Sequence, residues 1–200
     1  MHSGAAPHGR APRTMILIDP ALDSTVPPSM ARGAKLPSAR TLTRFLSEAQ
    51  SAIRLRGQVT VLLTTDAAIR DLNRRFRGKD QATDVLSFPS TNVISGPEKI
   101  AGDLAVSVET ARRQAAEQDH SLGVEIRILM LHGLLHLAGY DHETDAGEME
   151  KRERTLRARL GLPSGLIERA GSEPASQRVS RSARRGGESA SVKITRRRKP

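Results

Sequence analysis

The chain has 200 residues, of which 37% are hydrophobic and 27% are charged, and its formal net charge is +10. Because it has no cysteine, disulfides, thiolate zinc sites and iron–sulfur clusters are excluded, and any metal must be held by His, Asp or Glu. Four aromatic residues and no tryptophan argue against an aromatic stacking platform for single-stranded nucleic acid.

The positive charge is concentrated at the C-terminus. Nine Lys and Arg residues stand against two glutamates in residues 171–200, whereas residues 14–170 carry 21 basic and 20 acidic residues. This composition predicts a single domain over 15–165 and a disordered basic tail over 166–200. The tail either holds polyanions such as RNA through salt-sensitive contacts or only adds solubility.

The N-terminus is Gly-, Ala-, Pro- and His-rich, and residues 1–14 are predicted to be a flexible extension or to precede a start at Met15. It has no apolar signal core. The longest strongly apolar uncharged run, Ile128 to Tyr140, has 13 residues, whereas a membrane span needs about 20. We therefore expect a cytoplasmic protein with no membrane partner.

The first part of the domain is predicted to alternate strands and helices. Residues 15–19 are typical of a strand closed by Pro20. A helix opens at Pro37-Ser38, carries apolar residues at helical spacing and stops at Gly57. Residues 58–65 are rich in β-branched side chains and are predicted to form the next strand.

Asp66 is predicted to cap a short helix that ends in the turn at residues 77–80. Two strands follow, at residues 85–88 and 103–108, and then a helix over 109–119. These elements keep the alternation of apolar strands and amphipathic helices.

The last two predicted helices follow. Residues 121–138 form the most apolar helix, which is expected in the core and is broken by Gly139. Thr144 is predicted to cap a charged helix that runs through Leu160 and closes at Gly161. Together the elements, about four strands interleaved with five helices, predict a single domain of the α/β or α+β class.

Three histidines near the end of the apolar helix have the spacing of metal ligands. His132 and His136 are four residues apart and lie on one face of the helix. Gly139 can adopt a left-handed backbone that turns the chain back, and His142 follows three residues later. Three neutral imidazoles with an open position are typical of a catalytic zinc site. We predict one Zn²⁺ per chain at these residues.

The same spacing occurs in metzincin proteases, which carry a glutamate directly after the first histidine as general base. This chain has Gly133 there, which weakens a protease interpretation. Asp141 and Glu143 are the nearby carboxylates, and each could orient a ligand, activate water, cap a helix or remain a surface charge.

The pattern around the histidines resembles the YbeY family of bacterial endoribonucleases, which are rRNA maturation factors. The segments that carry the resemblance are His132–His142 (HGLLHLAGYDH), Phe76–Asp80 (FRGKD), Thr83–Pro89 (TDVLSFP), Gly102–Leu104 and Glu148–Glu150. The likeness covers about residues 16 to 162 and leaves the N-terminal extension and the basic tail outside.

The resemblance implies an α+β fold, in which a mixed four-stranded sheet packs against about five helices, and the three matching histidines as zinc ligands. It implies a zinc-dependent endoribonuclease acting on single-stranded RNA, in 3′-end processing of small-subunit rRNA and in ribosome quality control. The expected partners are rRNA and the small ribosomal subunit, with no DNA specificity. The family's functional arginine corresponds to Arg77, which is the predicted catalytic residue.

Arg77 suits this role because its planar guanidinium can grip a phosphate with two hydrogen bonds. An ordinary helix-terminal arginine is the alternative, and Lys79 is a weaker second phosphate contact. The sequence leaves open whether the nucleophile is a zinc-bound water or the RNA 2′-hydroxyl, and it does not give the oligomeric state. Two other functions compete: a ribosome assembly factor with a mainly structural zinc, and a divergent zinc peptidase.

Overall fold

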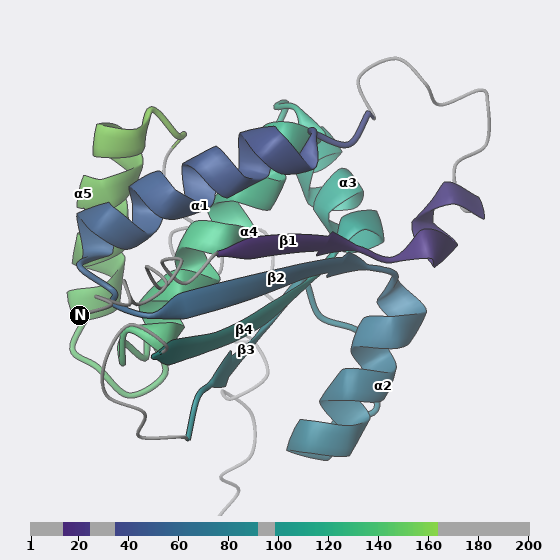
Figure 1. The fold of residues 1–200 in the computed structure, drawn as a ribbon, viewed down its shortest axis with the longest axis horizontal. Coiled ribbons are helices and arrows are strands. Elements are labelled where there is room, and N and C mark those ends of the chain that lie inside the picture. Colours follow the sequence, from purple (N-terminus) through teal and green to yellow (C-terminus); the bar gives the residue numbers. More distant parts are fainter. Residues whose placement is uncertain (1–13, 25–34, 92–98, 164–200) are drawn as a thin grey trace, which may run out of the picture. The chain divides into compact units, whose positions relative to one another are not determined.

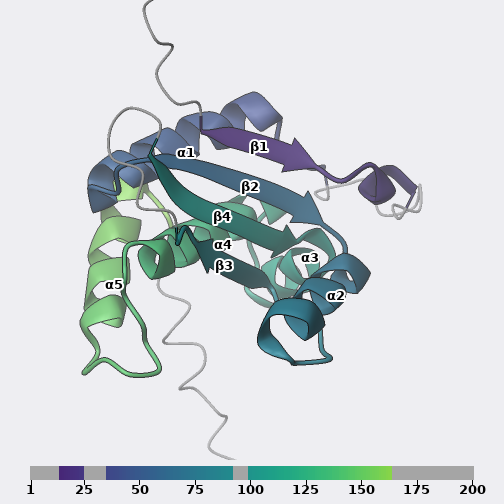
Figure 2. The same cartoon turned by 60° about the horizontal axis from the view of Figure 1, so that its bottom comes forward.

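A computed structural model describes residues 14–24, 35–91 and 99–163 of the chain. Within these ranges the chain forms four strands, five α-helices and one 3₁₀ helix. The strands make one sheet in the order β1-β2-β4-β3, which Figure 2 shows across its width. The predicted α+β fold with a mixed four-stranded sheet is confirmed.

Three strands of the sheet run parallel. β1 (Met15–Ile18), β2 (Gln58–Thr64) and β4 (Ile100–Ser107) pair in this way, and β3 (Val85–Pro89) pairs antiparallel with β4. β1 and β3 are therefore the edge strands, and β3 presents a free edge beside α4 in Figure 2.

The helices lie on both sides of the sheet. Their bounds are α1 (Ala39–Ile53), α2 (Asp66–Arg77), α3 (Val108–Glu117), α4 (Leu122–Leu137) and α5 (Glu148–Leu160). Figure 1 shows α1, α3, α4 and α5 on one side of the sheet and α2 on the other. One face is thus thickly covered, and the opposite face carries a single helix.

The core lies between α4 and the sheet. α4 is apolar around most of its circumference, which is the pattern of a fully buried helix. Val59, Val61 and Leu63 alternate along β2 and are fully buried. Burying each such side chain contributes about 1.5–3 kcal/mol, so the position of α4, which carries His132 and His136, is strongly fixed.

Two predicted boundaries were wrong, and one short helix was not predicted. Thr65, and not Asp66, caps α2: its side chain accepts a hydrogen bond from the N–H of Ala68 at 3.2 Å. β4 begins at Ile100, three residues before the predicted start at 103. The segment after β1 forms the 3₁₀ helix η1 (Pro20–Ser24), which the sequence did not indicate.

The start of α5 was also predicted wrongly. α5 begins at Glu148 rather than after Thr144, because Asp145 holds the chain in turns before it. The Asp145 carboxylate accepts hydrogen bonds from the N–H groups of Gly147 at 2.8 Å and Met149 at 2.9 Å. A side chain three residues before the first helical residue thus satisfies one of the first donors of the helix.

Residues 1–13 and 164–200 lie outside the described residues, so the flexible extension over 1–14, the bounds 15–165 of the domain and the basic tail over 166–200 stay predictions. Among the described helices, none has both the length and the hydropathy required to cross a bilayer.

Candidate metal centre

His132 and His136 project from the last two turns of α4. Gly139 follows the helix with a φ of 92°, a left-handed conformation that favours glycine and turns the chain away from the helix axis. The turn is fastened by the N–H of Tyr140, which donates to the carbonyl of Leu135 at 3.1 Å. This reversal brings His142 back toward the two histidines of the helix.

The three imidazoles converge. The Nε2 atoms of His132 and His136 are 3.2 Å apart, and one ligand atom from each of the three rings lies within 4.8 Å of the other two. Ligands about 2.0–2.1 Å from a tetrahedral zinc ion are separated by about 3.3 Å, so the first pair already has ligand spacing. Among the described residues this is the one group with metal-ligand geometry.

The environment of His136 favours the neutral form of its imidazole. Burial is the main cause that lowers the pKa of His136, and the neighbouring His132 and His142 lower it further. Only the neutral ring has a lone pair to offer a cation. His132 and His136 are half-buried and His142 is exposed. The centre is therefore enclosed on the α4 side and accessible at His142.

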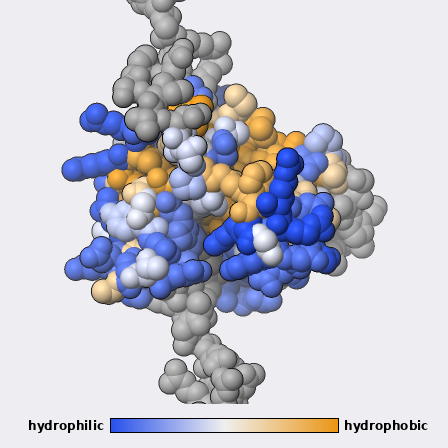
Figure 3. Space-filling view, turned by 90° about the horizontal axis from the view of Figure 1, so that it is seen from below, coloured by the Kyte–Doolittle hydropathy of each residue, from blue (hydrophilic) through white to orange (hydrophobic). Residues whose placement is uncertain are grey.

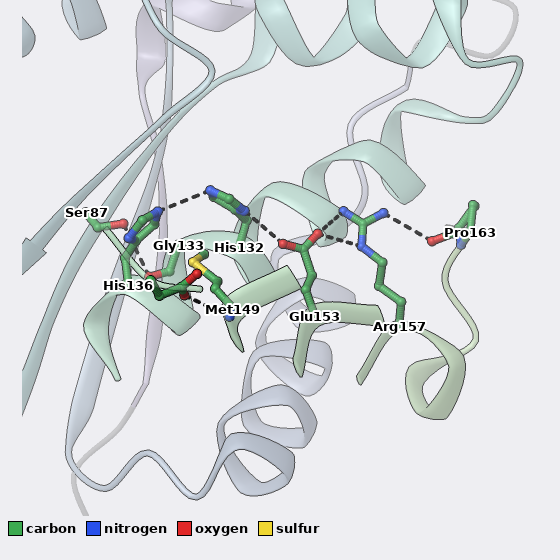
Figure 4. Close-up of polar contacts among 9 residues, drawn as sticks. Ser87, His132, Gly133, His136, Met149, Glu153, Arg157 and Pro163 are labelled. Atoms are coloured by element: carbon green, nitrogen blue, oxygen red, sulfur yellow. Dashed lines mark hydrogen bonds and ion pairs between the residues drawn. The ribbon is translucent and has the colours of Figure 1, made fainter. Parts of the chain in front are cut away.

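A buried carboxylate from α5 orients His132. Glu153 is 1% exposed. Its Oε2 lies 2.9 Å from the Nδ1 of His132, and its Oε1 accepts a hydrogen bond from Arg157 at 2.8 Å. Arg157 also donates to the carbonyl of Pro163 at 3.1 Å. Figure 4 shows these contacts as one continuous chain from His136 to Pro163. The contact at Nδ1 leaves the Nε2 of His132 for a metal.

Sequence reasoning missed Glu153 as an orienting residue. A signal was present, because Met149, Glu153, Leu156 and Leu160 recur at intervals of four, three and four residues. Such spacing marks the inward face of a helix, where an unpaired carboxylate would be costly. A glutamate on this inward face is therefore expected to have a buried polar partner.

The two carboxylates that the sequence did single out lie in the turn after Gly139. Asp141 accepts hydrogen bonds at 3.1 Å from the N–H of Glu143 and from the hydroxyl of Thr144. The N–H of Glu143 is the main cause that lowers the pKa of Asp141. Asp141 thus acts as a local turn cap, and Glu143 is exposed.

Gly133 lies where α4 crosses the sheet most closely. A Cβ at this position would approach the Leu104 Cδ2 to 2.8 Å and the Ser87 Oγ to 3.2 Å. The Ser87 hydroxyl donates to the Gly133 carbonyl at 3.3 Å, which ties β3 to the helix beside His132 (Figure 4). The close packing around Gly133 therefore leaves no room for the glutamate side chain that a metzincin protease carries at this position.

No hydrogen bond, ion pair or ring contact among the described residues joins Arg77 to the three histidines. Arg77 is exposed at the end of α2, and among the described residues its side chain forms no hydrogen bond or ion pair. Lys79 is also exposed, in the turn after α2. The alternative role of Arg77, bonding the last carbonyls of the helix, is therefore absent from the described contacts.

Comparison with known proteins supports the family resemblance that the histidine motif indicates. A family model described as Endoribonuclease YbeY matches residues 34–161. The chain is 52% identical over 147 residues to Endoribonuclease YbeY of Koribacter versatilis, covering 74% of this chain and 93% of that protein.

It is also 52% identical over 128 residues to Endoribonuclease YbeY of Solibacter usitatus, covering 64% of this chain and 83% of the relative. A solution structure from Thermotoga maritima is 25% identical and covers 80% of this chain and 99% of that chain, with a TM-score of 0.45. The family match spans more than half of the 200 residues, so the chain belongs to the YbeY family.

Proposed function

We propose that this protein is a zinc-dependent endoribonuclease that cuts single-stranded RNA in rRNA maturation, with rRNA of the small ribosomal subunit as its substrate. The observation that carries the proposal is the convergence of His132, His136 and His142 in a chain of this family. The YbeY relatives are named endoribonucleases, which supports RNA as the substrate class.

The donor set fits zinc. Three imidazole nitrogens with 3.2 Å between the first two suit a tetrahedral ion, and no thiolate or carboxylate among the described residues lies in the group. The exposure of His142 favours a fourth position open to substrate over a closed structural site. Zinc bound there would polarise a phosphate oxygen as a Lewis acid.

The side chains of the protein have separable roles in this proposal. His132, His136 and His142 hold the ion, and Glu153 keeps His132 in the tautomer whose Nε2 is free to bind it. Arg77, which has no carboxylate partner among the described residues, supplies a guanidinium for the negative charge that develops on the phosphate. Burial of His136 keeps its ring neutral and ready to bind.

A cleavage assay with metal control tests the proposal. Purified full-length protein is given a single-stranded RNA, with chelator, and then with zinc restored. We expect cleavage to stop on chelation and to return with zinc. The His136→Ala variant should lose both the metal, measured by elemental analysis, and the cleavage.

Two outcomes would assign a different function. If chelation lowers the unfolding midpoint while the metal-loaded protein leaves RNA intact, the zinc is structural and an assembly role replaces catalysis. If the loaded protein cuts peptides and not RNA, the peptidase alternative holds. A His120→Ala variant is the control for histidine removal, because His120 contacts Glu125 and lies outside the converging group.

A further inference from the structure

The sheet face covered by α2 has an aromatic pair at its margin. Ile69, Leu86 and Ala105 form a buried cluster where α2 meets the sheet, with Leu72 and Phe88 packed against it. Phe76 lies one turn beyond Leu72, yet 59% of its surface is exposed. Figure 3, which views the molecule from this side, shows apolar surface bordered by hydrophilic side chains.

The ring of Phe76 is fixed by its neighbours although it remains exposed to solvent. Its ring meets that of Phe88 edge-on, with the centroids 5.3 Å apart and an angle of 70° between the planes. The Arg75 guanidinium lies 5.5 Å from the Phe76 centroid, within cation–π range. Exposing a large ring costs hydrophobic free energy, so a ring that is fixed and exposed is a candidate contact for a ligand.

The charge around Phe76 is positive and available. The arginines earlier in α2 are neutralised, since Arg70 pairs with Asp80 at 2.8 Å and Arg74 pairs with Asp71 at 2.7 Å. By contrast, Arg75, Arg77 and Lys79 have no carboxylate partner in the described part of the chain. An aromatic ring flanked by free cations matches a nucleotide, which offers a flat base and an anionic phosphate.

We infer that Phe76, braced by Phe88, is a stacking subsite for one unpaired base of RNA, with Arg75 and Lys79 as contacts for the adjoining phosphates. The inference rests on the proposed function, because it names where the RNA outside the cleavage point is held. Asp103, paired across the strands with Phe88, repels phosphate from the sheet centre and directs the backbone toward α2.

The subsite and the metal centre are joined by β3. Ser87 points to α4, where its hydroxyl bonds the carbonyl next to His132, and Phe88 points to the opposite face. Neighbouring residues of one strand alternate in this way. Because β3 is an edge strand (Figure 2), an RNA strand that passes around its free edge meets both groups.

The low aromatic content argued against a stacking platform, and it does exclude one built of many rings. Only one exposed ring is needed for a single base, and the fold brings together two of the four aromatic residues from α2 and β3. Because Phe76 and Phe88 are 12 residues apart in sequence, the sequence did not indicate that their rings would meet.

Binding of a 2′-O-methyl oligonucleotide of about ten residues, with its integrity checked on a gel, tests the subsite. Affinity is measured by anisotropy of a labelled strand. Phe76→Leu keeps an apolar side chain and removes the ring, and we expect binding to weaken about 5- to 100-fold. Phe76→Trp should bind at least as well as the original, and its tryptophan, the only one in the chain, should be quenched by the oligonucleotide.

An oligonucleotide of the same length without bases in its central part separates stacking from charge. Phe76→Leu should bind it as the unmodified protein does; an equal loss for both oligonucleotides would overturn the inference. Leu17→Ala, at the other edge of the sheet and 45% exposed before substitution, is the matched control and should leave affinity unchanged.

These experiments can contradict the subsite and the proposed function independently of each other. If RNA is cleaved and Phe76→Leu binds with unchanged affinity, the subsite is wrong and this face is left for a protein partner. If no RNA is cleaved but binding depends on the Phe76 ring, the subsite stands and the catalytic proposal falls.

Discussion

The Oε2 of Glu153 lies 2.9 Å from the Nδ1 of His132, and the carboxylate that makes this contact is 1% exposed. The same carboxylate is paired with the buried Arg157. A residue of α5 that lies 11 positions after the last of the three histidines therefore fixes the first one. Carboxylates placed in this way orient the ring and raise the basicity of the nitrogen that binds metal.

Glu153→Gln should weaken zinc binding about 10- to 100-fold. Glutamine can still accept a hydrogen bond from Nδ1, but it removes the negative charge that supports the ligand. The measurement is a zinc titration against a competing chelator at a temperature well below unfolding.

Two further variants separate this effect from a loss of stability. Glu153→Gln leaves the buried Arg157 without its carboxylate, which is expected to lower stability by about 3–5 kcal/mol. Adding Arg157→Met removes the guanidinium that has lost its Glu153 partner and should restore much of the stability without restoring zinc affinity. Glu150→Gln, whose carboxylate contacts Arg154 on the same helix, should bind zinc normally. Normal affinity in the double variant would remove Glu153 from the metal centre.

Arg77→Ala should lower RNA cleavage by about 10²-fold or more through kcat, as expected for loss of one group that stabilises transition-state charge. Zinc content and thermal stability should change little, because Arg77 is exposed and unpaired within the described residues. Arg44→Ala on α1, also exposed, is the matched control. Turnover near that of the unmodified protein would return Arg77 to an ordinary surface role.

Much of the fold could be predicted from local patterns. The apolar run of α4, the Gly139 break and the spacing of the three histidines are each set by a few neighbouring residues, and the structure brings those histidines together. The α5 start was missed because Asp145, rather than the predicted Thr144, accepts hydrogen bonds from the N–H of Gly147, just before the helix, and from the helical N–H of Met149.

Contacts between distant segments could not be predicted in this way. Asp66 looks like a helix cap in sequence, but its carboxylate bonds Ser107 and Thr110, about 40 residues later. The Glu153–His132 contact and the Phe76–Phe88 pair likewise depend on how helices pack against each other or on a strand. Such partners are set by tertiary structure and leave only indirect signals in one sequence.

Asp66→Asn should destabilise the protein by about 1–3 kcal/mol at neutral pH, since Asp66 joins α2 to β4 and α3. Its carboxylate receives the hydroxyls of Ser107 and Thr110 and the Arg113 guanidinium. Denaturant unfolding measures the change. Asp71→Asn, at an exposed residue whose carboxylate forms a surface ion pair with Arg74, should change stability by less than about 1 kcal/mol.

The same contacts predict a pH dependence. Burial raises the pKa of Asp66, but the hydrogen bonds from Ser107, Thr110 and Arg113 outweigh it and lower the pKa below its usual value of 3.8. The unfolded chain therefore binds this proton more readily. The contribution of Asp66 to stability is full above about pH 4 and is lost as the pH falls through the folded-state pKa. The difference between Asp66→Asn and the original protein should shrink toward pH 3; a constant difference would contradict the shift.

Two glycines with positive φ should respond differently to alanine. Gly102 in β4 has a φ of 148°, and a Cβ there would lie 2.4 Å from the Phe88 carbonyl oxygen and 2.8 Å from the Leu137 Cδ2. Gly102→Ala therefore adds a clash with backbone to the conformational strain, and we expect a loss of about 2–5 kcal/mol. Gly139, with a φ of 92°, has no atom within 4 Å of that Cβ position, so Gly139→Ala should cost only the left-handed conformation, about 1–2 kcal/mol. Denaturant unfolding of the two metal-free variants checks the ranking. Equal losses would mean that β3 and α4 shift to admit the extra carbon, and that the close approach of β4 to them is not rigid.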